Sequence, residues 1–117
     1  MDLSKKDLDM FFKDWQLQSL RVLWESGEGL FSRDVWERVN ELRNQPISRT
    51  SIIIFLNDMV ESGILSGTDL TGQGGHKTRY EAKMNEQELK QHLAKLVKAK
   101  IDKMMTKKSS NNTSQAS

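Results

Sequence analysis

The chain has 117 residues, a length that fits one small domain with tails. It contains no cysteine, which excludes disulfides, thiolate metal sites and cysteine nucleophiles. The longest apolar run, Ile52 to Leu56, is far too short to span a membrane. Because no apolar segment follows Met1, we expect a cytoplasmic protein without a secretory signal.

The formal charge of +2 conceals an asymmetry between the two halves of the chain. Residues 1–62 hold 8 Lys and Arg against 11 Asp and Glu, whereas residues 63–117 hold 10 against 5. A basic half favours a polyanionic partner, because clustered cations release condensed counterions from a phosphate backbone. A lysine-rich helix is equally typical of a solvated surface, so charge alone leaves both interpretations open.

The first third of the chain predicts two or three helices. Residues 1–13 form an expected helical extension, with Ser4 as its cap and apolar residues at helical spacing that continue through Trp24. Asp14 is a possible second cap, so this stretch is either one bent helix or two. The glycines of the segment 26–29 favour a stop, and Ser32 then precedes an amphipathic helix that ends near Pro46.

The β-branched run at residues 52–56 fits either a buried strand or a helix, and length decides between them. Ser48 is a plausible N-cap and Ser62-Gly63 a plausible stop, and the positions between them place Ile52, Phe55, Leu56 and Met59 on one helical face. We therefore expect a third helix.

A β-hairpin is expected next, because residues 64–68 and 76–82 flank the glycine-rich segment Gly72-Gln73-Gly74-Gly75. A strand and not a helix follows these glycines, which argues against a phosphate-binding glycine loop. Residues 85–105 then show apolar residues at intervals of three and four, interspersed with lysines, and predict a long amphipathic helix. The polar residues 106–117 have almost nothing to bury, so we expect a disordered tail.

Three helices, a hairpin and a further helix are the order of a winged helix-turn-helix, a mainly α fold with a small β-hairpin as its wing. The stretches Leu17–Trp24, Ser32–Leu42 and above all Ser48–Leu65 resemble the penicillinase-repressor family of winged-helix transcriptional regulators. The resemblance covers roughly residues 14 to 82. We therefore expect residues 14–84 to form a DNA-binding domain. The family's dimerisation region commonly has several helices, whereas this chain offers one, and we expect residues 85–105 to form that dimerisation helix.

This resemblance implies a dimeric repressor that binds double-stranded DNA. The third helix would enter the major groove and the wing would contact the backbone or the adjacent minor groove. Asp58 stands where the family often has a basic residue, and Ile53 and Ile54 replace its more polar choices. No Asn-Phe dipeptide and no cysteine cluster follow the wing, so neither proteolytic nor metal-responsive induction carries over, and the inducer stays unknown.

Physical chemistry points to the same surface, because the first turns of a recognition helix enter the groove deepest. Arg49 suits guanine or phosphate, and Asn57 suits two hydrogen bonds to adenine. Ile53 and Ile54 fit thymine methyl groups or, equally, a protein partner. The candidate DNA-binding residues are Arg49, Thr50, Ser51, Ile53, Ile54, Asn57, His76, Lys77 and Arg79.

The core of so small a domain cannot bury the whole apolar face of the last helix, which favours a homodimer. Two recognition helices would then meet a palindromic operator whose half-sites lie about 10 bp apart or a multiple of that. The candidate dimerisation residues are Leu89, Leu93, Leu96, Val97, Ile101 and Met104.

Two other functions stay open at this point. Asp58, Glu61 and the exposed isoleucines would suit a winged-helix protein-interaction module without DNA specificity, and the basic last helix would suit a membrane surface, although we expect no membrane partner. No nucleophile-base pair or carboxylate dyad has the spacing of an active site, so we expect no enzyme and no cofactor. His76 and His92 lack a third ligand, so we expect no metal.

Overall fold

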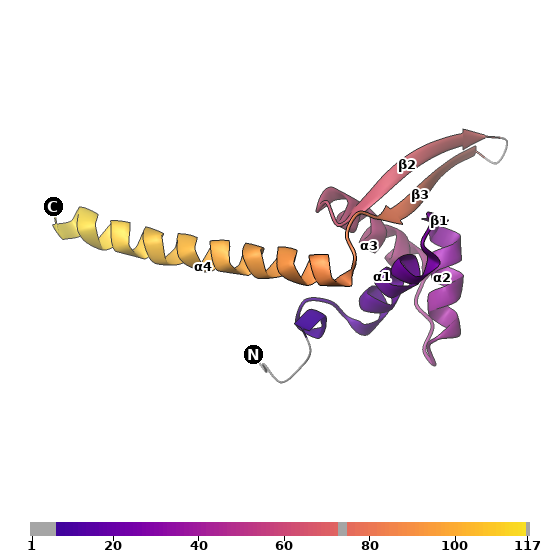
Figure 1. Cartoon of the computed structure of the whole chain (residues 1–117), viewed down its shortest axis with the longest axis horizontal. Coiled ribbons are helices and arrows are strands. Elements are labelled where there is room, and N and C mark those ends of the chain that lie inside the picture. Colours follow the sequence, from indigo (N-terminus) through magenta and orange to yellow (C-terminus); the bar gives the residue numbers. More distant parts are fainter. Residues whose placement is uncertain (1–6, 73–74, 117) are drawn as a thin grey trace. The chain divides into compact units, whose positions relative to one another are not determined.

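The computed structural model describes residues 7–72 and 75–116, without the side chains of residues 7, 72, 76 and 106–116. The chain forms a winged helix-turn-helix, mainly α with a small antiparallel sheet, as predicted. It divides into two units, Met1–Glu86 and Gln87–Ser117. Figure 1 shows the elements in chain order: η1 (Asp7–Met10), α1 (Asp14–Ser26), β1 (Leu30–Phe31), α2 (Ser32–Glu41), α3 (Arg49–Glu61), β2 (Leu65–Gly72), β3 (Gly75–Ala82) and α4 (Glu86–Ala116).

The N-terminal stretch forms two elements, the short 3-10 turn η1 and the helix α1, rather than one bent helix. The N-cap of α1 is Lys13 and not Asp14, and its backbone N–H donates to the Gln16 side-chain oxygen at 2.9 Å. The proposed cap Ser4 lies outside the described residues. The predicted stop is confirmed, because Gly27 ends α1 in the left-handed conformation, with φ of 67°, that glycine favours.

The three helices of the first unit bury their apolar faces against one another. Leu20 of α1 and Ile52 and Leu56 of α3 are completely buried. Trp15 packs edge-on against Phe55, with ring centroids 5.5 Å apart. The helical interpretation of the β-branched run is therefore correct, because Ile52, Phe55 and Leu56 are buried on one face of α3, whereas Ile53 and Ile54 lie outside that face.

A third strand, which the sequence did not predict, joins the hairpin to form a sheet in the order β1-β3-β2. Leu30 and Phe31 pair with Tyr80 and Arg79. Two residues are too few to show the alternation that marks a strand. The β2–β3 hairpin extends away from the three helices of the first unit, α1, α2 and α3 (Figure 1). It pairs over its whole described length, from Leu65↔Ala82 to Gly72↔Gly75.

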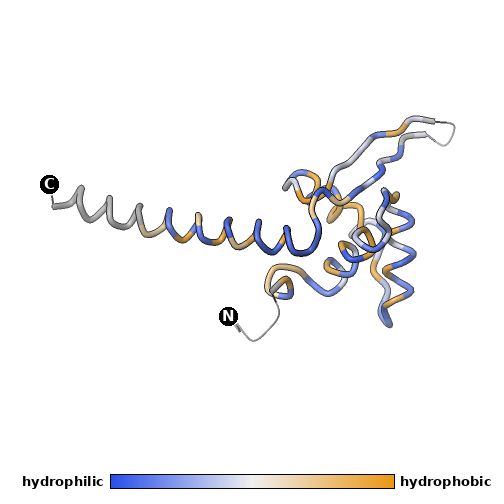
Figure 2. The backbone as a smooth tube through the Cα atoms, in the orientation of Figure 1, coloured by the Kyte–Doolittle hydropathy of each residue, from blue (hydrophilic) through white to orange (hydrophobic). Residues whose placement is uncertain are grey.

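In the second unit, α4 runs without a break from Glu86 to Ala116. Blue and orange residues alternate along its first half in Figure 2, as expected for an amphipathic helix. The helix continues through the segment 106–116 for which the sequence predicts disorder, since each added residue extends an existing ladder of backbone hydrogen bonds. No helix in the described part of the chain is long and apolar enough to cross a membrane.

Candidate nucleic-acid interface

The exposed side of α3 carries two parallel rows of side chains. Arg49, Ile53 and Asn57 follow one another at intervals of four, so they lie on one face of the helix, on the side of the wing. Thr50 and Ile54 lie on the neighbouring face and are exposed, Ile54 by 56%. Arg49 and Asn57 are exposed as well and Ile53 is half-buried, so the described residues of the first unit leave this side of α3 largely accessible, as a recognition helix requires.

The first row of α3 lines an open hollow of about 410 Å³, which we call the α3–wing hollow. Four elements contribute to its wall: the end of β1, the start of α2, the first three turns of α3 and strand β3. Its cations are Arg33, Arg49 and Lys77, against a single carboxylate from Asp34. The lining residues are Phe31, Ser32, Arg33, Asp34, Arg49, Ile53, Asn57, Lys77, Thr78 and Tyr80.

The wing cations lie on one face of β3, because strand residues two apart point to the same side. Lys77 and Arg79 are both exposed, and the Lys77 ammonium nitrogen lies 5.5 Å from the centre of the Phe31 ring. This distance is within the range of a cation–π contact. His76 belongs to the backbone of β3, but its side chain lies outside the described residues.

The absence of a side chain at Gly29 makes room for the side chain of Arg79. A Cβ atom at Gly29 would collide with the side chain of Arg79, at its Nε, Cγ and Cζ atoms. The guanidinium group therefore occupies the space that any other residue at this position would fill. Because Arg79 also pairs with Phe31 in the sheet, strand β1 and the residue before it support both wing cations.

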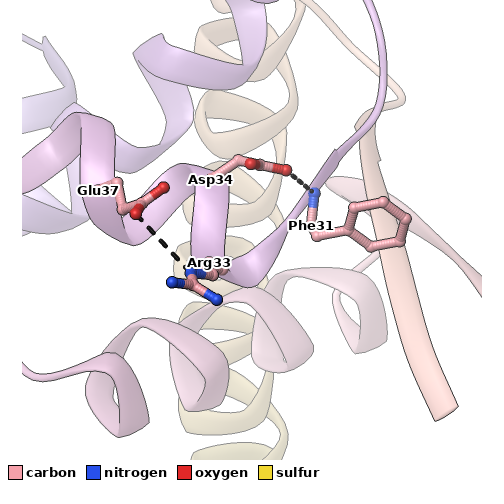
Figure 3. Close-up of polar contacts among 4 residues, drawn as sticks. All are labelled: Phe31, Arg33, Asp34 and Glu37. Atoms are coloured by element: carbon pink, nitrogen blue, oxygen red, sulfur yellow. Dashed lines mark hydrogen bonds and ion pairs between the residues drawn. The ribbon is translucent and has the colours of Figure 1, made fainter. Parts of the chain in front are cut away.

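The start of α2 adds a contribution that the sequence did not predict. The backbone N–H of Phe31 donates to the Asp34 carboxylate at 3.1 Å and caps the helix, and Arg33 lies 3.7 Å from Glu37 (Figure 3). Both members of this ion pair are more than half exposed, so it restrains Arg33 only weakly. Arg33 follows the helix-start signal at Ser32 directly, but only the fold brings it into the α3–wing hollow.

Asn57 and Tyr80 join α3 to the wing. The Tyr80 hydroxyl donates to the Asn57 side-chain oxygen, and the two oxygens are 2.7 Å apart. Tyr80 is buried, and this burial raises the pKa of its phenol above the usual value of 10, to which the nearby Asp69 carboxylate adds. The sequence showed Tyr80 alternating with Lys77 and Arg79 in its strand, but not which residue it would meet.

The N-cap of α3 uses one of the predicted DNA-binding residues. Ser48 caps the helix, as predicted, by accepting a hydrogen bond from the Ser51 backbone N–H at 3.1 Å. Its own hydroxyl donates to the Ser51 hydroxyl at 2.9 Å. Ser51 therefore stabilises the first turn of α3 as well as lying near its exposed side.

The two acidic residues that argued for a different function lie away from the cations. Asp58 and Glu61 are exposed and fall on the same face of α3 as Thr50 and Ile54. Neither lines the α3–wing hollow. Their charge therefore leaves the hollow with a cationic lining.

The candidate dimerisation residues of α4 differ in exposure. Leu89 is buried and Leu93 half-buried. The exposed members, at 37% to 65%, are Leu96, Val97, Ile101 and Met104, and Met105 adds to them.

Comparison with known proteins agrees with this geometry. The family model of the penicillinase repressor matches residues 14–115. A solved structure from Thermoplasma acidophilum, assigned as a transcriptional regulator, has the same fold with a TM-score of 0.55 at 20% identity, over 79% of this chain and 91% of its own. No curated protein matches the chain. The chain therefore belongs to the penicillinase repressor family and is a DNA-binding transcription regulator, not an enzyme.

Proposed function

We propose that this protein is a homodimeric repressor that acts in the cytoplasm on a palindromic operator. Residues 14–84 would bind one half-site and residues 85–105 would hold the two copies together. The observation that supports DNA contact best is the α3–wing hollow, where cations from α2, α3 and β3 adjoin the exposed side of α3. Cations arranged in this way match a phosphate backbone that passes between a recognition helix and a wing.

Individual residues then divide between reading bases and binding the backbone. Arg49 and Thr50 stand in the first turn of α3, the part that enters the major groove deepest, with Ser51 beside them. Ile53 and Ile54 follow one turn later and suit thymine methyl groups. Lys77 and Arg79, with His76 beside them, bind the backbone from the wing.

The proposal predicts different effects for the two kinds of contact. Arg49→Ala should weaken specific binding by about 1–3 kcal/mol, and Lys77→Ala should weaken binding to all sequences alike and flatten the salt dependence. Operator duplexes selected from a random pool would provide the probe, with affinities measured by gel shift over a salt series.

Arg21→Ala serves as the matched control, since Arg21 is exposed on α1 and lies outside the α3–wing hollow. It removes the same charge and should leave specific affinity within about twofold of the unmodified protein, the scale of a surface substitution that removes no contact. Unchanged affinity in both Arg49→Ala and Lys77→Ala would contradict the proposal.

A protein-interaction module is the second candidate function, and the exposed Ile54 favours it. An apolar side chain flanked by Asp58 would suit a protein surface better than DNA. Pull-down from nuclease-treated lysate separates the two functions. A defined partner that Ile54→Asp abolishes, in a protein without DNA affinity, would support this second function.

A further inference from the structure

The side-chain amide of Asn57 has its oxygen and its nitrogen in different environments. The buried Tyr80 hydroxyl lies 2.7 Å from the side-chain oxygen, and a phenol can donate only one hydrogen. The amide oxygen is therefore the acceptor of this bond. Within the described residues, both N–H groups of the same amide are left for other partners, on an otherwise exposed side chain.

This orientation matters for what Asn57 can recognise. An asparagine that reads adenine uses both ends at once, because it accepts from the N6 amino group and donates to N7. Here one of the two lone pairs of the oxygen already accepts from the buried Tyr80 hydroxyl of another element, and this bond fixes the direction of the amide. Turning the amide toward adenine would leave the Tyr80 hydroxyl without its bond inside the protein, which costs free energy.

The surroundings of Asn57 favour an anionic acceptor. The same α3–wing hollow is lined by Arg49, which lies in the same row of α3 as Asn57, and by Lys77 of the wing. Asn57 lies in the third turn of α3, two turns beyond the residues that enter the groove deepest. An amide that offers two donors in a hollow lined by these cations matches a phosphate oxygen.

We propose that Asn57 binds a phosphate of the DNA backbone as a hydrogen-bond donor, held in that orientation by Tyr80, and does not read adenine. The inference rests on the proposed DNA-binding function. Asn57 is then the contacting residue and Tyr80 a positioning residue, whose buried ring couples the wing to the recognition helix.

Base-by-base competition on selected operator duplexes tests the contact. Asn57→Ala should weaken binding by about fivefold to every duplex, with base preferences unchanged at all positions. Asn57→Asp should weaken binding by on the order of tenfold or more, because it places a carboxylate against the phosphate. Asn44→Asp adds the same charge outside the α3–wing hollow and should change affinity much less.

Tyr80→Phe tests the positioning role. It should weaken binding about as much as Asn57→Ala, and the double variant should be no weaker than either, because Tyr80 acts through Asn57. A neutral methylphosphonate at each operator phosphate in turn locates the contact. At one position, the methylphosphonate should weaken operator binding by the unmodified protein but not by the Asn57→Ala variant.

The possible outcomes separate this inference from the proposed function. If the unmodified protein selects no duplex from the pool, the proposed function fails and the inference with it. If it binds a defined operator but Asn57→Ala loses discrimination at one base pair only, the inference alone fails. Unchanged or tighter binding by Tyr80→Phe would overturn the inference in the same way.

Discussion

At the scale of single residues, the proposed interface depends on residues to which we assign no DNA contact. Tyr80 orients Asn57, and Phe31 lies under the Lys77 ammonium group. Gly29 provides the space for the Arg79 side chain. Each of these supporting residues comes from a different part of the chain than the start of α3, to which we assign the groove contacts.

The single tyrosine of the sequence makes its titration directly measurable. Burial raises the pKa of Tyr80 above 10, so the folded chain holds this proton more tightly than the unfolded chain. Its contribution to stability is therefore complete below pH 10 and is lost as the pH rises through the folded pKa. The midpoint of the phenolate absorbance change should lie above pH 10, and the free energy of unfolding should fall as the pH rises through that midpoint.

Tyr80→Phe is the control for this titration. The variant should lack the absorbance change. The unfolding free energies of the variant and the unmodified protein should also become more similar as the pH rises above 10. A phenol that ionises at or below pH 10 in the folded protein would contradict the buried environment.

Gly29→Ala should displace the guanidinium group of Arg79 without disturbing the fold. The three atoms nearest to the new Cβ all belong to the flexible, exposed side chain of Arg79, so the free energy of unfolding should change by less than about 1 kcal/mol. DNA affinity should fall for all sequences, as in Arg79→Ala, and the double variant should fall no further. Additive losses in a gel-shift titration would show that Gly29 does not act through Arg79.

At the scale of elements, α3 presents its exposed rows only if its first turn is well formed. Ser48→Ala removes the oxygen that accepts from the Ser51 N–H and should lower the free energy of unfolding by about 1 kcal/mol, measured by urea denaturation.

Ser62→Ala provides the matched control for the cap. Ser62 is the C-cap of the same helix, and its backbone N–H donates to the backbone carbonyl of Asp58 at 3.0 Å. Alanine retains this backbone hydrogen bond. Its effect should stay within about 0.5 kcal/mol. Equal losses in the two variants would show that the Ser48 side chain adds nothing to the helix.

At the scale of the whole molecule, the exposed apolar residues of α4 carry the proposed dimer. Ile101→Lys places a charge among Leu96, Val97 and Met104 and should shift the protein toward monomer in light-scattering chromatography. Operator affinity should fall together with dimerisation, because a monomer gains contacts from one half-site only.

Lys98→Ile adds an apolar residue elsewhere on the same helix and should leave the dimer intact. A monomeric unmodified protein at micromolar concentration would contradict the proposed dimer. A dimer that survives Ile101→Lys would place its interface outside α4.

The sequence by itself determined the elements and most of the candidate surface. Periodicity and caps at Ser48 and Gly27 located the helices, because these signals are local and depend on neighbouring residues only. The sequence did not locate the break after η1 or the strand β1, because a turn and a two-residue strand are too short to carry a pattern. The continuation of α4 to Ala116 was likewise not predicted from composition.

Only the tertiary structure decided which side chains act together. It brought Arg33 beside Arg49 and Lys77 in the α3–wing hollow, and it gave the Asn57 oxygen to Tyr80, 23 residues further along the chain. A sequence pattern shows that Asn57 lies on the exposed side of a helix, but a hydrogen bond between distant segments depends on how the elements pack. For that reason the sequence analysis matched Asn57 to adenine, whereas the fold turns its amide oxygen toward Tyr80 and leaves its N–H groups as donors for phosphate, as we propose.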